Sequence, residues 1–307
     1  MKVSIRDLSK MTGFSPATIS NALNHKKGVN RETAEEIFRV ARETGYLSAN
    51  AVTKIRLVIF KKNGQILEET PFFQQMIEGI EEECHRLGYE MVISHVDQRN
   101  PNYQKQVRDL LEEQGVGIIL LGTEMMDGDL SLYRNASCPV LLLDHWTESM
   151  DFNSVLINNA DAARAITEHL LDNGHREVGY LRGNYRIKAF RSRFIGFQTA
   201  LKKYKVPYKE EYTVTVGTYM STACQDMLEY LKKKPKLPTA FFADNDIIAL
   251  GAMKALQEMG YRIPEDISIV GFDDLTFSEI SSPPLTTLRV EKREMGKMAV
   301  RRLVELI

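Results

Sequence analysis

From residue 55 onward, short apolar segments alternate with longer segments whose apolar residues recur at helical spacing. Residues 116–122 are almost continuously apolar, which is typical of a parallel strand covered by helices on both faces. Repeated units of this kind predict an α/β fold with parallel sheets. The alternation breaks near 157–159, so we predict two Rossmann-like subdomains. The expected strands are 55–60, 89–96, 116–122, 138–143, 155–157, 177–181, 213–216, 239–243 and 267–271, and the expected helices are 72–87, 101–114, 160–173, 190–204, 221–233 and 247–259.

Polar and aromatic residues follow several of these strands. Open parallel sheets bind ligands outside the carboxyl ends of their strands. Carboxylates accept hydrogen bonds from hydroxyls and aromatic rings pack on the C–H face of a sugar, so we expect a polyhydroxylated ligand. A helix cap is the alternative for each Asp, and a core position is the alternative for Phe72. The candidates are Phe72, Phe73, Asp97, Asp144, His145, Trp146, Asn245, Asp246, Asp273 and Asp274.

The first two dozen residues predict two short helices joined by a tight turn. Ser15 is a suitable N-cap and Pro16 suits the first helical position, so a second helix is expected at 16–24. Its apolar residues share one face, which leaves Ala17, Thr18 and Asn21 on the other. A helix-turn-helix reads DNA through residues at the start of its second helix. An ordinary helical hairpin is the alternative.

Further signals extend this N-terminal module. Ser4, with Asp7 three residues later, indicates a capping box that starts the first helix. Asn30 is expected to cap a third helix at 31–44. Residues 1–30 contain five lysines or arginines and one acid, and the basic loop 25–28 is expected to face the DNA backbone. A solvated basic surface is the alternative, since the excess charge is small.

Composition excludes several other classes of protein. No apolar run approaches the ~20 residues that span a membrane, and the N-terminus has no apolar signal segment. Cys84, Cys138 and Cys224 are far apart, so we expect free or buried thiols in a reducing cytoplasm. The histidines show no metal-ligand spacing, and no cofactor motif, phosphate-binding loop or nucleophile motif is present. We therefore expect no metal, no cofactor and no enzymatic activity.

Several motifs stand in fixed order along the chain, at residues 4–24, 29–33 and 45–46 near the N-terminus, and at 163–176, 193–197, 243–251, 263–274 and 283–288 in the body. Together they resemble the lactose-repressor (LacI/GalR) family of transcriptional regulators. This resemblance covers nearly the whole chain. It implies a dimeric or tetrameric regulator with a DNA-binding headpiece and a periplasmic-binding-protein-like core that holds an effector between two subdomains. The implied boundaries are 1–46 for the headpiece, 47–54 for a hinge, 55–157 with 289–307 for the first subdomain, and 158–288 for the second.

The resemblance also assigns site residues. Ala17, Thr18 and Asn21 match the base-reading positions, and Arg193 and Tyr219 join the effector candidates. Arg193 suits ligand oxygens through its planar fork, and a structural salt bridge is its alternative. The expected DNA-binding residues are Ser4, Ser15, Pro16, Ala17, Thr18, Ser20, Asn21, Asn24, His25, Lys26 and Asn30. The expected effector-binding residues are Phe72, Phe73, Asp97, Asp144, Trp146, Arg193, Tyr219, Asn245 and Asp273.

Two departures from the family pattern stand out. Relatives have a hinge helix with a leucine that wedges into the minor groove, whereas here the segment after Tyr46 is short and only Val52 approaches that leucine in character. Minor-groove wedging is therefore not expected to carry over. The sequence ends at Ile307 inside an expected helix, whereas relatives continue into a further strand of the second subdomain.

The leading functional hypothesis is an effector-controlled regulator that binds operator DNA as a homodimer, without a membrane partner. A sugar or glycoside is the first expectation for the effector, because Trp146 and several carboxylates flank the expected site. A purine or nucleoside is the alternative, since Phe72 and Phe73 can stack on a base. A solute-binding protein without DNA function, and a sugar-processing enzyme that uses Asp144 or Asp273 as a base, are the other hypotheses considered.

Overall fold

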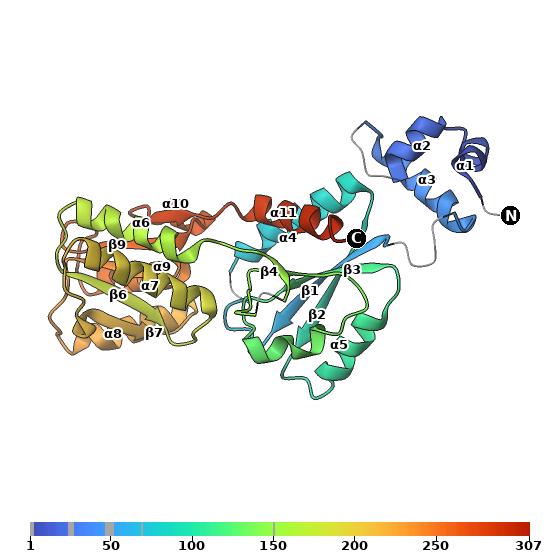
Figure 1. The fold of residues 1–307 in the computed structure, drawn as a ribbon. Coiled ribbons are helices and arrows are strands. Elements are labelled where there is room, and N and C mark those ends of the chain that lie inside the picture. Colours follow the sequence, from blue (N-terminus) through green and yellow to red (C-terminus); the bar gives the residue numbers. More distant parts are fainter. Residues whose placement is uncertain (1–2, 24–27, 47–51, 69, 150) are drawn as a thin grey trace. The chain divides into compact units, whose positions relative to one another are not determined.

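The computed structural model describes residues 3–23, 28–46, 52–68, 70–149 and 151–307 (Figure 1). Three short helices come first: α1 (Ile5–Thr12), α2 (Pro16–Leu23) and α3 (Arg31–Glu43). Their inward faces share a small core of their own. The buried members are Leu8, Ile19, Ala22, Ile37, Val40 and Ala41.

A parallel five-stranded sheet follows, in the order β2-β1-β3-β4-β5. Its strands are β1 (Lys54–Lys61), β2 (Glu90–Asp97), β3 (Val116–Leu121), β4 (Val140–Leu143) and β5 (Asn153–Val155). The strand β3 is buried throughout, because both of its faces are covered. On one face, Ile118 and Leu120 share a core with residues of α5 (Tyr103–Glu112) and the 3₁₀ helix η1 (Asp127–Tyr133).

The other face of this sheet is covered by helices that are far apart in the sequence. The C-terminal helix α11 (Lys292–Val304) contacts β3, β4 and β5, and it lies against α4 (Phe72–Leu87). These two helices approach so closely that a Cβ on Gly79 would collide with the carbonyl oxygen of Arg293, and a Cβ on Gly296 with that of Met76. Glycine is required at both positions for this packing.

A second parallel five-stranded sheet has the order β10-β9-β8-β6-β7. Its strands are β6 (Val178–Gly183), β7 (Thr213–Val216), β8 (Ala240–Ala243), β9 (Ser268–Asp273) and β10 (Thr286–Arg289). The helix α6 (Asn159–Asp172) packs beside α7 (Lys188–Lys203), and α8 (Met220–Lys232) packs beside α9 (Asp246–Glu258). Two short helices complete this part, η2 (Glu210–Tyr212) and α10 (Thr276–Ile280).

The chain divides into two compact units, and their boundaries differ from those expected. The first comprises Met1–Lys62, Gln74–Leu156 and Lys292–Ile307, and the second comprises Asn63–Phe73 and Ile157–Glu291. Placing 63–73 with the first sheet was therefore wrong. Ile66, Phe72 and Phe73 are buried, and the carbonyl of Gln65 accepts a hydrogen bond from the Thr218 hydroxyl at 3.4 Å, so this segment packs with the second unit.

Most expected strands and helices match within a few residues, and the differences are informative. The strands β6 and β9 extend two residues further, through Gly183 and Asp273. The hinge expected at 47–54 is shorter, since Lys54 already pairs with Glu90 in β1; residues 47–51 lie outside the described part of the chain. Four short elements had no expected counterpart: η1, η2, α10 and β10. None of the described helices is long and apolar enough to cross a membrane.

Candidate functional site

The start of α2 is built as the sequence predicts. The backbone N–H of Thr18 donates to the Ser15 hydroxyl oxygen at 3.1 Å, and the two hydroxyls lie 2.8 Å apart. Pro16 occupies the first helical position, and Gly13 ends α1 with a φ of 77°, a left-handed conformation that suits glycine. The predicted helix-turn-helix geometry is therefore present, with a capped second helix.

The faces of α2 separate apolar from polar residues. Ile19 and Ala22 are buried in the three-helix core, whereas Ser15, Pro16 and Ala17 are exposed. The half-buried residues of this helix include Thr18, Ser20 and Asn21. The first turn of α2 thus presents small side chains to solvent, which lets a helix approach the floor of a DNA groove.

The remaining expected DNA-binding residues divide into two groups. Ser4 and Asn30 are helix caps: Ser4 forms a reciprocal capping box with Asp7, and the Asn30 side chain accepts from the Thr33 N–H at 2.8 Å. The hydrogen bonds from Ser4 lower the pKa of Asp7. Asn24, His25 and Lys26 lie outside the described residues.

In the second unit, Arg193 on α7 joins several segments near the carboxyl ends of β8 and β9. Its Nε donates to Asn159 Oδ1 at 2.9 Å, its Nη1 to the Asp244 carbonyl at 2.7 Å, and its Nη2 to Asp273 Oδ1 at 3.2 Å. Its guanidinium carbon lies 3.6 Å from the centre of the Phe272 ring. Arg193 is almost fully buried, so these partners hold its fork in a fixed direction.

The predicted residues Asn245 and Asp273 lie in this cluster. Asn245 also caps α9, because its side-chain oxygen accepts from the Ile248 N–H at 3.0 Å. Asp273 ends β9 with a φ of 115°, and Asp274 follows with a φ of 53°. Two successive non-glycine residues in the left-handed region are unusual, and such conformations gather at ligand-binding sites.

Two residues of this cluster were not expected from the sequence. Asn159 binds the Arg193 fork, and Asp244 is fully buried beneath it. The Asp244 carboxylate accepts from the Tyr180 hydroxyl at 2.5 Å and from the Gly183 N–H at 2.8 Å, and it pairs with Arg186. The signal for Asp244 was available, since it directly precedes Asn245 and Asp246 at the end of β8. No local pattern marked Asn159.

Tyr219 and the two phenylalanines belong to the second unit as well. Tyr219 is half-buried and precedes α8 directly. Phe72 and Phe73 are both buried, and their rings meet edge to face with centroids 5.1 Å apart. The core alternative for Phe72 is therefore the one that its burial favours.

In the first unit, the expected residues follow β4 and β2. Asp144 has a φ of 57° and accepts from the Thr123 hydroxyl at 2.7 Å, so it is buried but hydrogen-bonded. Trp146 is half-buried, and its ring lies 6.3 Å from that of the buried His145. Asp97 forms a surface ion pair with Arg99 at 2.6 Å, which occupies its carboxylate. The described residues contain no cluster suited to a metal ion.

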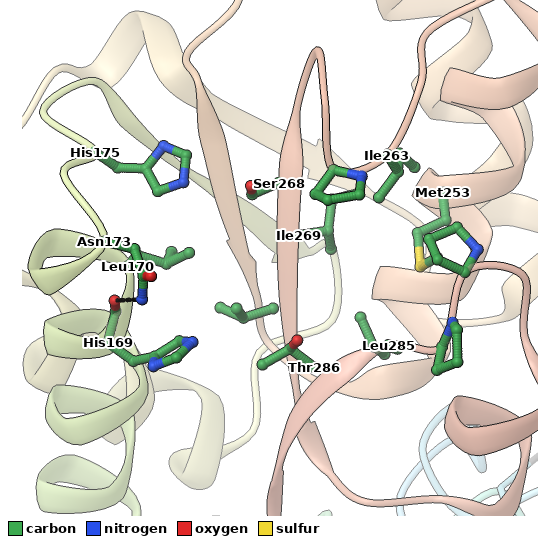
Figure 2. Close-up of a pocket in the computed structure, with 14 residues that line it drawn as sticks. His169, Leu170, Asn173, His175, Met253, Ile263, Ser268, Ile269, Leu285 and Thr286 are labelled. Atoms are coloured by element: carbon green, nitrogen blue, oxygen red, sulfur yellow. Dashed lines mark hydrogen bonds between the residues drawn. The ribbon is translucent and has the colours of Figure 1, made fainter.

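A cavity of about 570 Å³ lies at the opposite, amino edge of the second sheet (Figure 2). It is lined by the end of α6, the starts of β9 and β10, and two proline-containing segments. His169, His175 and Thr286 are among its polar residues. None of the residues predicted to bind the effector lines it, so the polar cluster around Arg193 remains the candidate site.

Comparisons with known proteins point to one family. A family described as periplasmic binding protein-like domain matches residues 167–307. The lac repressor dimer bound to operator and the anti-inducer ONPF is 26% identical, with a TM-score of 0.71 over 100% of this chain and 93% of that one. The HTH-type transcriptional repressor PurR of Mannheimia succiniciproducens is 31% identical over 99% of this chain and 91% of its own length. This chain belongs to the LacI/GalR family.

The transcriptional regulator CelR in its cellobiose complex is also similar, at 25% identity and a TM-score of 0.72 over 99% of this chain and 93% of that one. This LacI/GalR protein is a sequence-specific DNA-binding transcriptional regulator with an effector-binding core, and its relatives are regulators rather than enzymes. The helix α2 lies in the headpiece, and the Arg193 cluster lies in the core.

Proposed function

We propose that this protein represses transcription by placing the first turn of α2 in the major groove of operator DNA. The observation that carries the proposal is the exposure of Pro16 and Ala17 at a capped helix start, above the buried Ile19 and Ala22. Ala17, Thr18 and Asn21 are the proposed base-reading residues. The caps Ser4, Ser15 and Asn30 orient N–H groups at helix starts, where DNA phosphates bind favourably.

A gel-shift experiment on the DNA upstream of its own gene tests this proposal. We expect a retarded band at ~50 mM salt that weakens as salt rises, because phosphate contacts release counterions. Ala17→Asp should abolish the band, since it places a negative charge against DNA while an acid in the first turn leaves the helix stable. Arg39→Gln makes the same change in net charge at an exposed position of α3, where Arg39 pairs with Glu36 and Glu43, and it serves as the control. The absence of any retarded band would contradict the proposal.

We also propose that a sugar or glycoside controls DNA binding, and that Arg193, Asn245 and Asp273 contact its hydroxyls. Arg193 donates hydrogen bonds, Asp273 accepts them, and the amide of Asn245 can do both. These buried side chains suit a ligand whose hydroxyls both donate and accept hydrogen bonds. Tyr219, which lies in the same unit, is proposed as a further contact, and Asp144 and Trp146 stay candidates in the first unit. The cellobiose complex of CelR supports a sugar. The burial of Phe72 and Phe73 against each other weakens the case for a stacked purine.

Thermal-shift screening against sugars, glycosides, purines and nucleosides tests the effector class. A ligand at 100 times its dissociation constant stabilises the folded state by about 2.7 kcal/mol, which a melting curve detects readily. We expect a sugar or glycoside to raise the melting temperature, and Asp273→Asn to abolish that response. A response to purines or nucleosides alone would replace the sugar proposal.

The protein is further proposed to act as a homodimer in the cytoplasm, where its operator lies. An apolar surface on the second unit supports the dimer. Phe277 and Ile280 on α10 are 42% and 72% exposed, and they border a groove of about 430 Å³ that Met220, Leu250 and Met253 also line. Exposed apolar side chains gathered in this way are typical of protein interfaces. Two headpieces on a two-fold dimer would read a near-palindromic operator.

A further inference from the structure

Asp246, the first residue of α9, is a fully buried carboxylate outside the set of proposed effector contacts. Its Oδ1 accepts from the Thr287 hydroxyl at 2.5 Å. Its Oδ2 accepts from the Leu275 N–H at 2.9 Å and from the Ser278 hydroxyl at 2.7 Å. A Cβ on Gly271 would collide with Oδ1, so β9 passes directly against the carboxylate. Burial raises the pKa of this carboxyl, and the hydrogen bonds from the three donors act in the opposite direction.

Two of the three donors fix the turn that presents Asp273. Leu275 directly follows the left-handed pair Asp273 and Asp274, and its N–H is held by Asp246. The Thr287 hydroxyl donates to Asp246 and accepts from the Asp274 N–H at 3.3 Å. A strained backbone of this kind persists only where its surroundings hold it, and Asp246 supplies that support.

The third donor connects the same carboxylate to α10. Ser278 is 1% exposed, and besides its bond to Asp246 it accepts from the Leu285 N–H at 2.8 Å through its carbonyl. Its neighbours in sequence include Phe277 and, two residues on, Ile280, the exposed apolar residues of α10. The orientation of α10 therefore depends on Ser278, and Ser278 depends on Asp246.

We propose that Asp246 is a positioning residue that holds the Asp273 turn and the α10 surface as one block, so that changes at the effector site alter dimer affinity. This inference rests on the proposed effector cluster and the proposed dimer surface. Coupling between two sites is reciprocal, so effector binding and dimer assembly would each change the affinity of the other by the same factor.

Three substitutions in the full-length protein separate the arms of this arrangement. Asp246→Asn keeps the shape but turns an amide N–H₂ toward hydroxyl and N–H donors. Ser278→Ala removes the arm to α10, and Thr287→Val removes the arm to the turn with little change in shape. Thr276→Ala, at an exposed position of α10, is the control. The measurements are the dimer dissociation constant by sedimentation and the hydrogen exchange of residues 273–275.

We expect Asp246→Asn to weaken the dimer about tenfold and to accelerate exchange in the turn, since a hydrogen bond to a charged group contributes more than a neutral one. Ser278→Ala should weaken the dimer without accelerating exchange in the turn. Thr287→Val should accelerate exchange in the turn and, because the turn and α10 form one block, weaken the dimer as well. Asp273→Asn should change the dimer dissociation constant of the wild-type protein. It should cause no further change in the Asp246→Asn variant, as expected for coupled sites in a double-mutant cycle.

The outcomes test the coupling separately from the proposed homodimer on which it rests. A wild-type protein that sediments as a monomer would overturn the homodimer and with it the coupling. A wild-type dimer whose dissociation constant is unchanged by Asp246→Asn, or for which the effects of Asp273→Asn and Asp246→Asn simply add, would overturn the coupling and leave the homodimer standing. Circular dichroism of each variant identifies any that fail to fold. If Asp246→Asn fails to fold, the dimer dissociation constant of Ser278→Ala tests the proposal in its place.

Discussion

The guanidinium of Arg193 donates to the carboxylate of Asp273 across 3.2 Å, although the two residues are 80 positions apart. Arg193 comes from α7 and Asp273 from the end of β9, so this contact ties a helix to the turn that follows a central strand. Both side chains are buried, which strengthens their attraction and fixes the direction of the Arg193 fork.

Arg193→Lys should abolish most of the effector response while the protein still folds and binds DNA. A lysine keeps the charge but offers no planar fork, so it cannot serve Asn159, Asp244 and Asp273 together. We expect at least a tenfold loss of affinity for a sugar identified by thermal shift, measured by calorimetry. Arg191→Lys, on the exposed face of the same helix, is the matched control. Unchanged affinity in Arg193→Lys would remove Arg193 from the site.

Asn21→Ala should relax the operator preference at one base pair. An asparagine in the major groove pairs with two atoms of adenine, and such a contact discriminates against other bases by about 1–3 kcal/mol. Binding to operators with each base in turn at that position measures the effect. The wild-type protein should favour one base and the variant should not. A variant that loses affinity equally for all four operators would assign Asn21 a contact without base specificity.

Glu83→Gln should destabilise the first unit by about 2 kcal/mol. The Glu83 side chain is buried, and it accepts from Arg86 on α4 at 2.6 Å and from Arg301 on α11 at 2.7 Å. The amide of glutamine removes the charge that joins these two helices. Chemical denaturation measures the change. Glu82→Gln, an exposed neighbour paired with Lys297, should change stability much less, because exposed ion pairs contribute little.

The same residue predicts a loss of stability in acid. Burial alone would raise the pKa of Glu83, but hydrogen bonds from Arg86 and Arg301 outweigh it and lower the pKa from 4.5 to about 2. A carboxyl with a lowered pKa stabilises the folded state fully above its ordinary pKa and loses that contribution as the pH falls toward 2. Wild type should therefore lose stability relative to Glu83→Gln between about pH 4.5 and pH 2. Parallel stability curves over this range would contradict the assignment.

Ile280→Lys should separate the proposed dimer. Ile280 is the most exposed of the large apolar residues on α10, and a charge there would have to be buried at the interface. We expect the dimer dissociation constant to rise at least tenfold in sedimentation experiments, with a parallel loss of operator affinity because single headpieces contact one half-site. Ile195→Lys, at an exposed position on α7, is the control. Equal dimerisation of both variants would place the interface elsewhere.

The local features of this fold were predictable from sequence because they depend on neighbouring residues. Helix starts at Ser4, Ser15 and Asn30 follow from side chains that cap N–H groups three residues away. The expected helix at 72–87 matches α4, since apolar residues at helical spacing are followed by Gly88, whose φ of 77° ends it. The short elements η1, η2, α10 and β10 were missed because their formation depends on packing rather than on periodicity.

The sequence by itself determined the alternation of strands and helices, the capped start of α2, and the positions of Asn245 and Asp273 at strand ends, because each is encoded within a few residues. Only the tertiary structure decided which of these residues meet. It brought Asn159 to Arg193, placed Asp246 between the Asp273 turn and α10, and assigned 63–73 to the second unit. Such pairings follow from the burial of polar groups, which must find hydrogen-bond partners wherever the packed chain supplies them.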